Sequence, residues 1–119
     1  MEGANSIAAI ESAAKQVLAT WNQIKPKLEI KFKTRRGDEA AELMKEGAEL
    51  LKQFIFLSNE AEGQVAESLA VCTHKPMNAE ERIHFIFSKP RLYHSYIQLS
   101  GLFAEQEKLH AKLTASRKQ

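Results

Sequence analysis

The sequence predicts an all-α protein, a single antiparallel bundle of about four main helices plus one short helix over residues 1–119. Strong helix formers, chiefly Ala, Glu, Lys, Leu and Gln, dominate the composition, against five Gly and three Pro. Apolar residues recur every three or four positions along most of the chain, which is the period of a helix. A chain of 119 residues is also long enough to bury a core without a disulfide or a metal.

The first helix is expected from about Asn5 to Gln23, where apolar side chains form one stripe. Asn5 or Ser6 is suited to cap it, because a short side-chain oxygen accepts an unpaired amide proton of the first turn. The stripe, with Trp21 near its end, consists of Ile7, Ile10, Ala14, Val17, Trp21 and Ile24.

The next segment, residues 27–33, alternates apolar and charged side chains, which by itself favours a strand. We favour a helix, because the chain has no second alternating segment with which a strand could pair. Pro26 is suited to the first turn of that helix and Gly37 to its end. The alternation leaves the strand open as an alternative.

The clearest helix is expected to run from Asp38, as its cap, to about Leu57. Its apolar residues cover more than half of its circumference, which predicts burial on two sides at the centre of the bundle. Gly47 weakens an exposed helix by about 1 kcal/mol relative to Ala, so we expect it at a close crossing with a neighbouring helix.

Beyond this helix the pattern weakens over residues 58–77. Asn78 and Glu81 have the spacing of a capping box for a short helix that ends at about Phe87. The last helix is expected from about Pro90 to Ala115. Its inner stripe is predicted at Leu92, Tyr96, Leu99, Phe103, His110 and Leu113.

Composition limits the functional classes. Cys72 is the only cysteine, so no intrachain disulfide can form, and no secretion signal is present, so we expect a cytoplasmic protein. The longest apolar runs, such as residues 54–57, fall far short of the roughly 20 residues of a membrane span. No Gly-rich phosphate loop or recognisable nucleophile motif occurs, so we expect no cofactor and no enzymatic activity.

Two Glu-x-x-His pairs, Glu81 with His84 and Glu107 with His110, each place a carboxylate and an imidazole one helical turn apart. Two such pairs, with further glutamates, build the dinuclear metal site of ferritin-like bundles. Both residue types are frequent on helices and the helix of Glu81 is short, so chance pairing is the favoured interpretation. We expect His110 to be a hydrogen-bonded, semi-buried residue near the end of the bundle.

Six of the 17 Lys and Arg residues lie within residues 25–36, against one acid. In a helix, Lys27, Lys31 and Arg35 share a stripe, and together with Arg36 they could neutralise phosphates. No nucleic-acid reading motif accompanies them, and the net charge is only +2. Weak nucleic-acid binding is therefore the alternative function, and a solvated cationic face is the default.

The segment from residue 82 to residue 98 combines guanidinium groups with aromatic rings, a mixture enriched at protein interfaces. We expect a partner-binding surface here, and a non-enzymatic protein-interaction module with an unknown protein partner as the function. Whether the chain is a monomer or a homodimer stays open. The residues expected to bind the partner are Arg82, Lys89, Arg91, Tyr93, His94 and Gln98.

Residues 75–99, with Lys-Pro pairs at positions 75–76 and 89–90, resemble the YpoC-like proteins of Gram-positive bacteria. The similarity is strongest over residues 75–113 and weaker over residues 38–59. Members of that family tend to be encoded near genes for DNA replication and repair, so the resemblance implies a small bacterial cytoplasmic protein linked to genome maintenance. It carries over no activity, cofactor or site residue.

Overall fold

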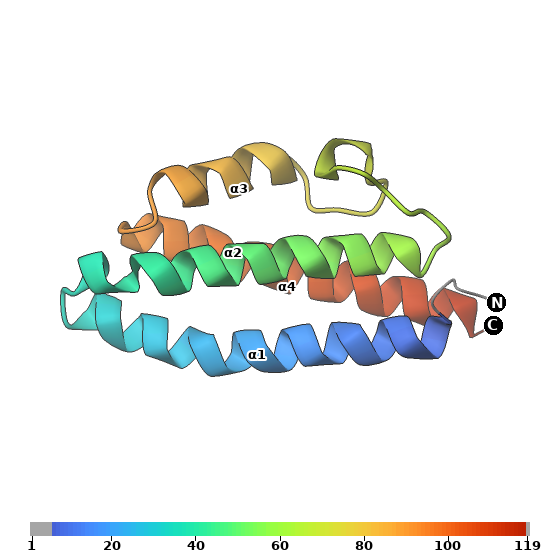
Figure 1. Cartoon of the computed structure of the whole chain (residues 1–119), viewed down its shortest axis with the longest axis horizontal. Helices are drawn as coiled ribbons and strands as arrows, with labels where there is room; N and C mark the ends of the chain where they lie inside the picture. The colour runs from blue at the N-terminus through green and yellow to red at the C-terminus, as the bar shows by residue number, and fades with distance from the viewer. Residues whose placement is uncertain (1–5, 119) are drawn as a thin grey trace.

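A computed structural model of the chain describes residues 6–118 and confirms an all-α bundle. Consecutive helices run antiparallel, and the elongated molecule measures 48 × 25 × 25 Å (Figure 1). Helix α2 contacts all three other helices, with α1 and α4 along its length and the short α3 alongside part of it. The elements are α1 (Ile7–Lys33), α2 (Gly37–Glu60), the 3-10 turn η1 (Leu69–Val71), α3 (Ala79–Ser88) and α4 (Tyr93–Arg117).

Helix α1 corrects the predicted division of the N-terminal third. The two helices expected on either side of Pro26 are one continuous helix of 27 residues, which also excludes the strand over residues 27–33. Proline removes the hydrogen bond to the carbonyl four residues earlier, here that of Asn22. Both Pro26 and Asn22 are exposed, so water can serve the freed carbonyl. The predicted cap at Ser6 is confirmed by its bond from the Ala9 amide, at 3.1 Å, whereas Asn5 lies outside the described residues.

The turn between α1 and α2 corrects the expected role of Gly37. The chain reverses at Arg35, whose φ of 59° lies in the left-handed region, and Gly37 begins α2 instead of ending α1. Asp38 accordingly lies in the first turn of α2 and does not cap it. A Cβ atom on Gly37 would lie 2.5 Å from the carbonyl oxygen of Arg91. The glycine therefore lets the α1–α2 turn touch the α3–α4 turn.

The core confirms the predicted central position of α2. Leu51 and Phe54 have no exposed surface. Trp21 of α1 stacks on Phe103 of α4 with ring centroids 4.4 Å apart. Gly47 lies at the crossing, where an added Cβ would come within 2.9 Å of Leu99 and 3.0 Å of Trp21, so the predicted close approach is confirmed.

The connection between α2 and α3, residues 61–78, is held by side chains that serve its backbone. Buried Asn59 bonds both the amide and the carbonyl of His74, each at 2.8 Å. Lys75 donates to the carbonyls of Leu69 and Ala70 at the 3-10 turn. The capping box predicted at Asn78 is wrong: Asn78 adopts a left-handed conformation with φ 57° and makes no side-chain cap bond. Asparagine tolerates that conformation better than most residues.

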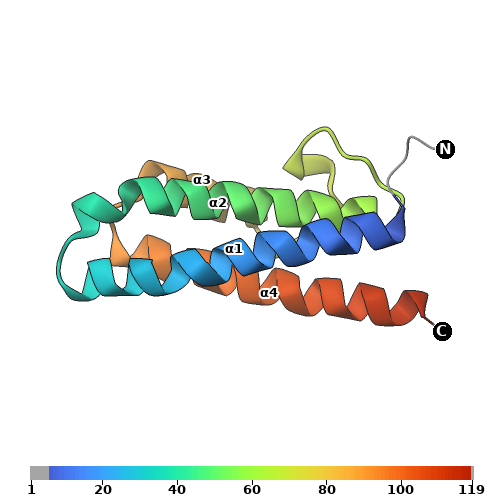
Figure 2. The same ribbon diagram turned by 60° about the horizontal axis from the view of Figure 1, so that its bottom comes forward.

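One end of the bundle contains helix termini and the other contains turns between helices. Figure 2 shows that α1 begins and α4 finishes at one end, while the α1–α2 and α3–α4 turns lie together at the other. Among the described helices, none is long and apolar enough to cross a membrane.

Candidate functional site

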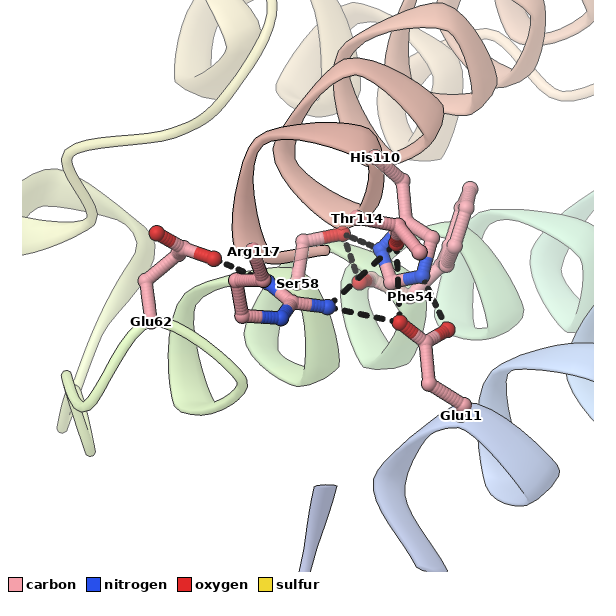
Figure 3. Close-up of polar contacts among 7 residues, drawn as sticks. All are labelled: Glu11, Phe54, Ser58, Glu62, His110, Thr114 and Arg117. Atoms are coloured by element: carbon pink, nitrogen blue, oxygen red, sulfur yellow. Dashed lines mark hydrogen bonds and ion pairs between the residues drawn. The ribbon is translucent and has the colours of Figure 1, made fainter. Parts of the chain in front are cut away.

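The densest polar cluster lies where α1 begins and α4 ends. Figure 3 shows carboxylates, two hydroxyls, an imidazole and a guanidinium pointing toward one another between α1, α2 and α4. We call this cluster the polar latch. It comprises Glu11, Ser58, Glu62, His110, Thr114 and Arg117.

His110 is the centre of the polar latch. Its Nε2 lies 2.6 Å from Glu11 Oε1, and its Nδ1 lies 2.8 Å from Ser58 Oγ. The Ser58 hydroxyl also lies 3.1 Å from the carbonyl of Phe54 and has one proton to donate. The hydroxyl donates this proton either to the carbonyl of Phe54 or to Nδ1 of His110, depending on the tautomer of the imidazole. The expectation of a hydrogen-bonded, semi-buried His110 near the bundle end is confirmed.

The order serine, histidine, glutamate is also that of a nucleophile, a base and an orienting acid. Ser58 has no exposed surface, however, so no substrate atom can reach its hydroxyl in this arrangement. The geometry instead joins three helices by side-chain hydrogen bonds. We therefore interpret the polar latch as a structural fastening.

Glu11 carries most of this fastening. Its second carboxylate oxygen accepts from Thr114 at 2.8 Å and from Arg117 at 2.7 Å. Arg117 pairs in addition with Glu62, just after α2. Burial works to raise the pKa of Glu11, but the hydrogen bonds and charges of His110, Thr114 and Arg117 together lower it. The carboxylate is thus held in its charged form.

The two Glu-x-x-His pairs do not meet. His110 is engaged by Glu11 and Ser58, whereas Glu81, His84 and Glu107 are exposed. Over residues 6–118, no group of three or more His, Cys, Asp or Glu side chains is placed to hold a metal ion. The dinuclear arrangement considered from the sequence is not assembled here.

Cys72 is buried, and burial raises the pKa of its thiol, which favours the less reactive protonated form.

At the opposite side of α4, two of the residues expected to bind a partner are used inside the molecule. Arg82 of α3 donates from Nε to Gln98 at 2.9 Å and from both terminal nitrogens to Glu105, at 3.0 and 2.7 Å. It also reaches the carbonyl of Met77. The bond from Arg82 lowers the pKa of Glu105. Arg82 and Gln98 therefore fasten α3 to α4, a role that the sequence did not reveal because it depends on Glu105.

The remaining predicted partner residues are exposed at the α3–α4 turn and the start of α4. Three large apolar side chains accompany them: Tyr93 is 58% exposed, Ile97 48% and Leu92 46%. Leu92, expected on the inner stripe, is exposed because it precedes α4 in an extended conformation with ψ 137°. We call this region the corner surface. It comprises Lys89, Arg91, Leu92, Tyr93, His94 and Ile97.

Rings beneath and beside the corner surface support it. Tyr93 makes an edge contact with Phe32 of α1, with centroids 5.8 Å apart, and His94 makes one with Phe85 of α3 at 5.6 Å. Tyr96, buried as expected, donates from its hydroxyl to Glu29 of α1 at 2.8 Å. Burial and the Glu29 carboxylate raise the pKa of Tyr96, so it stays a donor. The start of α4 is thus fixed against both α1 and α3.

The surface is hollowed on both sides of Phe85. A depression of about 290 Å³ lies between α3 and α4 and includes Arg82 and His94 in its wall. A second depression, of about 490 Å³, lies along α3 and reaches Lys89. The corner surface is therefore bordered by two shallow depressions.

The basic residues of the nucleic-acid alternative lie at the same end of the bundle. Lys31 and Arg36 both face Glu39, at 3.6 and 3.7 Å, and this acid partly neutralises them. Lys27 and Arg35 are exposed. In the sequence, this cluster and the partner-binding segment are separate features. The contact of Gly37 with Arg91 joins them, and no local pattern could have shown it.

Comparison with known proteins gives one match. A family model described as YpoC-like protein matches residues 11–118, nearly the whole chain. A search of curated proteins and a search of solved structures each returned no match.

Proposed function

The chain belongs to the YpoC-like protein family, and we propose that it is a non-enzymatic protein-interaction module that binds a protein partner at the corner surface. One observation carries the proposal: Leu92, Tyr93 and Ile97 expose large apolar side chains together, beside the cations Lys89 and Arg91. Exposed apolar groups rimmed by polar ones are typical of protein interaction sites. Tyrosine and arginine, with tryptophan, are also the residues most enriched among those that contribute most of the binding energy.

The support beneath the surface favours the same function. Binding costs free energy for every side chain and segment that it must immobilise. Here Phe32 and Tyr96 hold the start of α4 from one side, and the bonds of Arg82 to Gln98 and Glu105 hold it from the other. A partner would therefore meet a surface that is already ordered.

We place this function in the bacterial cytoplasm and in genome maintenance. The cytoplasmic location is supported by the single cysteine, which is reduced and buried. The link to genome maintenance is supported only by the resemblance to the YpoC-like family. It sets where a partner is first sought, among the proteins of DNA replication and repair.

The test is affinity capture from the native cell, with the recovered proteins quantified by mass spectrometry. The double variant Tyr93→Ala, Ile97→Ala should lose a specific set of proteins that the unchanged chain recovers. The matched control is Val65→Ala, Val71→Ala, which also removes two exposed apolar side chains but lies in the α2–α3 connection. Equal loss in both variants, or no loss in either, would remove the corner surface as the binding site.

Nucleic-acid binding is the second candidate, favoured by the gathering of Lys27, Lys31, Arg35 and Arg36 at one end of α1. Each phosphate neutralised releases counterions, so binding to plain duplex or single-stranded DNA must weaken steeply with added salt. A salt titration of DNA binding measures this directly. If the affinity for DNA does not change with salt concentration, or if no DNA binds at low salt, nucleic-acid binding is excluded as the function.

A further inference from the structure

The two turns at one end of the bundle bring cations from distant parts of the sequence together. The α1–α2 turn touches the α3–α4 turn where Gly37 meets the Arg91 carbonyl, and Arg91 reaches Asp38 of α2 at 3.2 Å. The basic residues gathered at this end are Lys31, Lys33, Arg35, Arg36, Lys89 and Arg91.

The acids at this end are fewer and are already engaged. Glu39 faces Lys31 and Arg36, Asp38 faces Arg91, and Glu29 accepts from Tyr96. Within residues 6–118, no ion pair involves Lys33, Arg35 or Lys89. The turn end therefore keeps an excess of positive charge beside the exposed apolar residues of the corner surface.

We infer that the occupant of the corner surface is an acidic segment of another protein, with large apolar side chains that pack on Tyr93, Ile97 and Leu92 and carboxylates that face Arg91, Lys89 and the α1–α2 turn. This inference rests on the proposed function and adds the chemistry of the partner. Complementary charge both selects the partner and speeds the encounter.

The aliphatic residues are the reason for choosing a protein over a nucleic acid. Single-stranded nucleic acids are bound through cations that face the phosphates and aromatic rings that stack on the bases, whereas exposed aliphatic side chains rimmed by polar groups are typical of protein interaction sites. Ile97 lies one helical turn from Tyr93, so the two side chains are neighbours on the surface of α4 and offer adjacent apolar contacts. A polypeptide with carboxylates next to apolar side chains uses both properties of the surface.

Asp38 provides a sharp test, because it already occupies Arg91 in the free protein. An acidic segment must compete with this carboxylate, so Asp38→Asn should tighten its binding, whereas Arg91→Glu should weaken it by about tenfold or more. Lys112→Glu is the control for the second change, since it alters the charge equally on an exposed position near the other end of α4. Glu107→Gln is the control for the first.

The experiment selects binders from a display library of random peptides on the intact chain, then measures their affinity for these variants. We expect peptides rich in Asp, Glu and large apolar residues, whose binding weakens with salt and responds to Arg91→Glu and Asp38→Asn in opposite directions. The two controls should leave affinity unchanged.

The other outcomes separate the two claims. Neutral or basic peptides that depend on Tyr93 and Ile97 would overturn the acidic partner while leaving the interaction module standing. If none of the selected peptides binds the double variant Tyr93→Ala, Ile97→Ala more weakly than the unchanged chain, both claims are wrong. Binding of duplex DNA that depends on Arg91, without any acidic peptide, would replace the protein partner by a nucleic acid.

Discussion

The two ends of the bundle are both rich in polar side chains, but they use them differently. At the polar latch, Glu11 bonds to His110 and Arg117, His110 bonds in turn to Ser58, and little of these side chains is exposed to solvent. At the corner surface, the cations and the apolar side chains of Tyr93 and Ile97 stay exposed. The first end therefore supports stability, and the second is the one where we propose recognition.

The comparison shows why a count of chemically interesting residues misleads. The polar latch has the residue types of a catalytic site, yet its hydroxyl is buried and every group has an internal partner. The corner surface has no such constellation. Its significance lies in large apolar side chains that the fold leaves about half exposed, although leaving them exposed gains no burial energy.

The largest effect is expected at the polar latch. Glu11→Ala removes the acceptor shared by His110, Thr114 and Arg117 and leaves Glu62 as the remaining carboxylate partner of a partly buried guanidinium. We expect the free energy of unfolding to fall by about 3 kcal/mol. Urea denaturation measures it, with exposed Glu107→Ala as a control that should change stability by less than about 0.5 kcal/mol. A latch variant as stable as this control would remove the distinction between the ends.

A smaller effect is expected where the two turns meet. Alanine normally stabilises a helix relative to glycine, but a Cβ at position 37 would lie 2.5 Å from the Arg91 carbonyl oxygen. Gly37→Ala should therefore lower stability, by about 2 kcal/mol, and weaken partner binding as the turns separate. Gly101→Ala is the matched change, because its Cβ would meet nothing closer than 3.9 Å. It should gain up to about 1 kcal/mol. Stabilisation by both changes would show that the turns do not press together.

The contribution of the polar latch to stability should be lost at acidic pH and be present at neutral pH. The folded-state pKa of Glu11 is lowered from the ordinary 4.5, so the carboxylate binds protons more readily in the unfolded chain. Its contribution to stability is thus complete above pH 4.5 and is lost as the pH falls through the lowered pKa. Thermal unfolding followed from neutral to acidic pH should show a steeper decline for the unchanged chain than for Glu11→Gln. Parallel declines would mean that Glu11 is not held charged by the fold.

The smallest effect on stability is expected at the corner surface. Ile97 is 48% exposed and alanine has the higher helix propensity, so Ile97→Ala should change the free energy of unfolding by less than about 0.5 kcal/mol. Urea denaturation of this variant and of Glu11→Ala compares the two ends of the bundle by the same quantity, the free energy of unfolding. A loss at Ile97 as large as that at Glu11 would mark it as part of the core.

The fold could be predicted from the sequence where the information is local and periodic. The central position of α2 and the close crossing at Gly47 followed from the width of its apolar face and one glycine. The continuity of α1 through Pro26 did not follow, because proline usually begins a helix. Only exposure of Pro26 and Asn22 on the finished bundle makes the interruption tolerable.

The candidate surface was predicted only in part, for a related reason. The cations and rings of residues 89–94 were visible as a cluster, but two of the predicted residues bond to each other, since Arg82 donates to Gln98 as well as to Glu105. Leu92 and Ile97 join the surface because of where α4 begins and which face it turns outward. The meeting of both turns at Arg91 depends on packing between segments more than 50 positions apart, which no spacing rule encodes.

The most direct test of the division between the two ends is a map of where a partner binds. The isotope-labelled chain is titrated with an acidic peptide selected on it, and backbone amide chemical shifts are followed by NMR. The account predicts that shifts move in residues 31–38 and 89–98, while those around Glu11 and Arg117 stay in place. Shifts concentrated at the polar latch, with the corner surface unmoved, would contradict it.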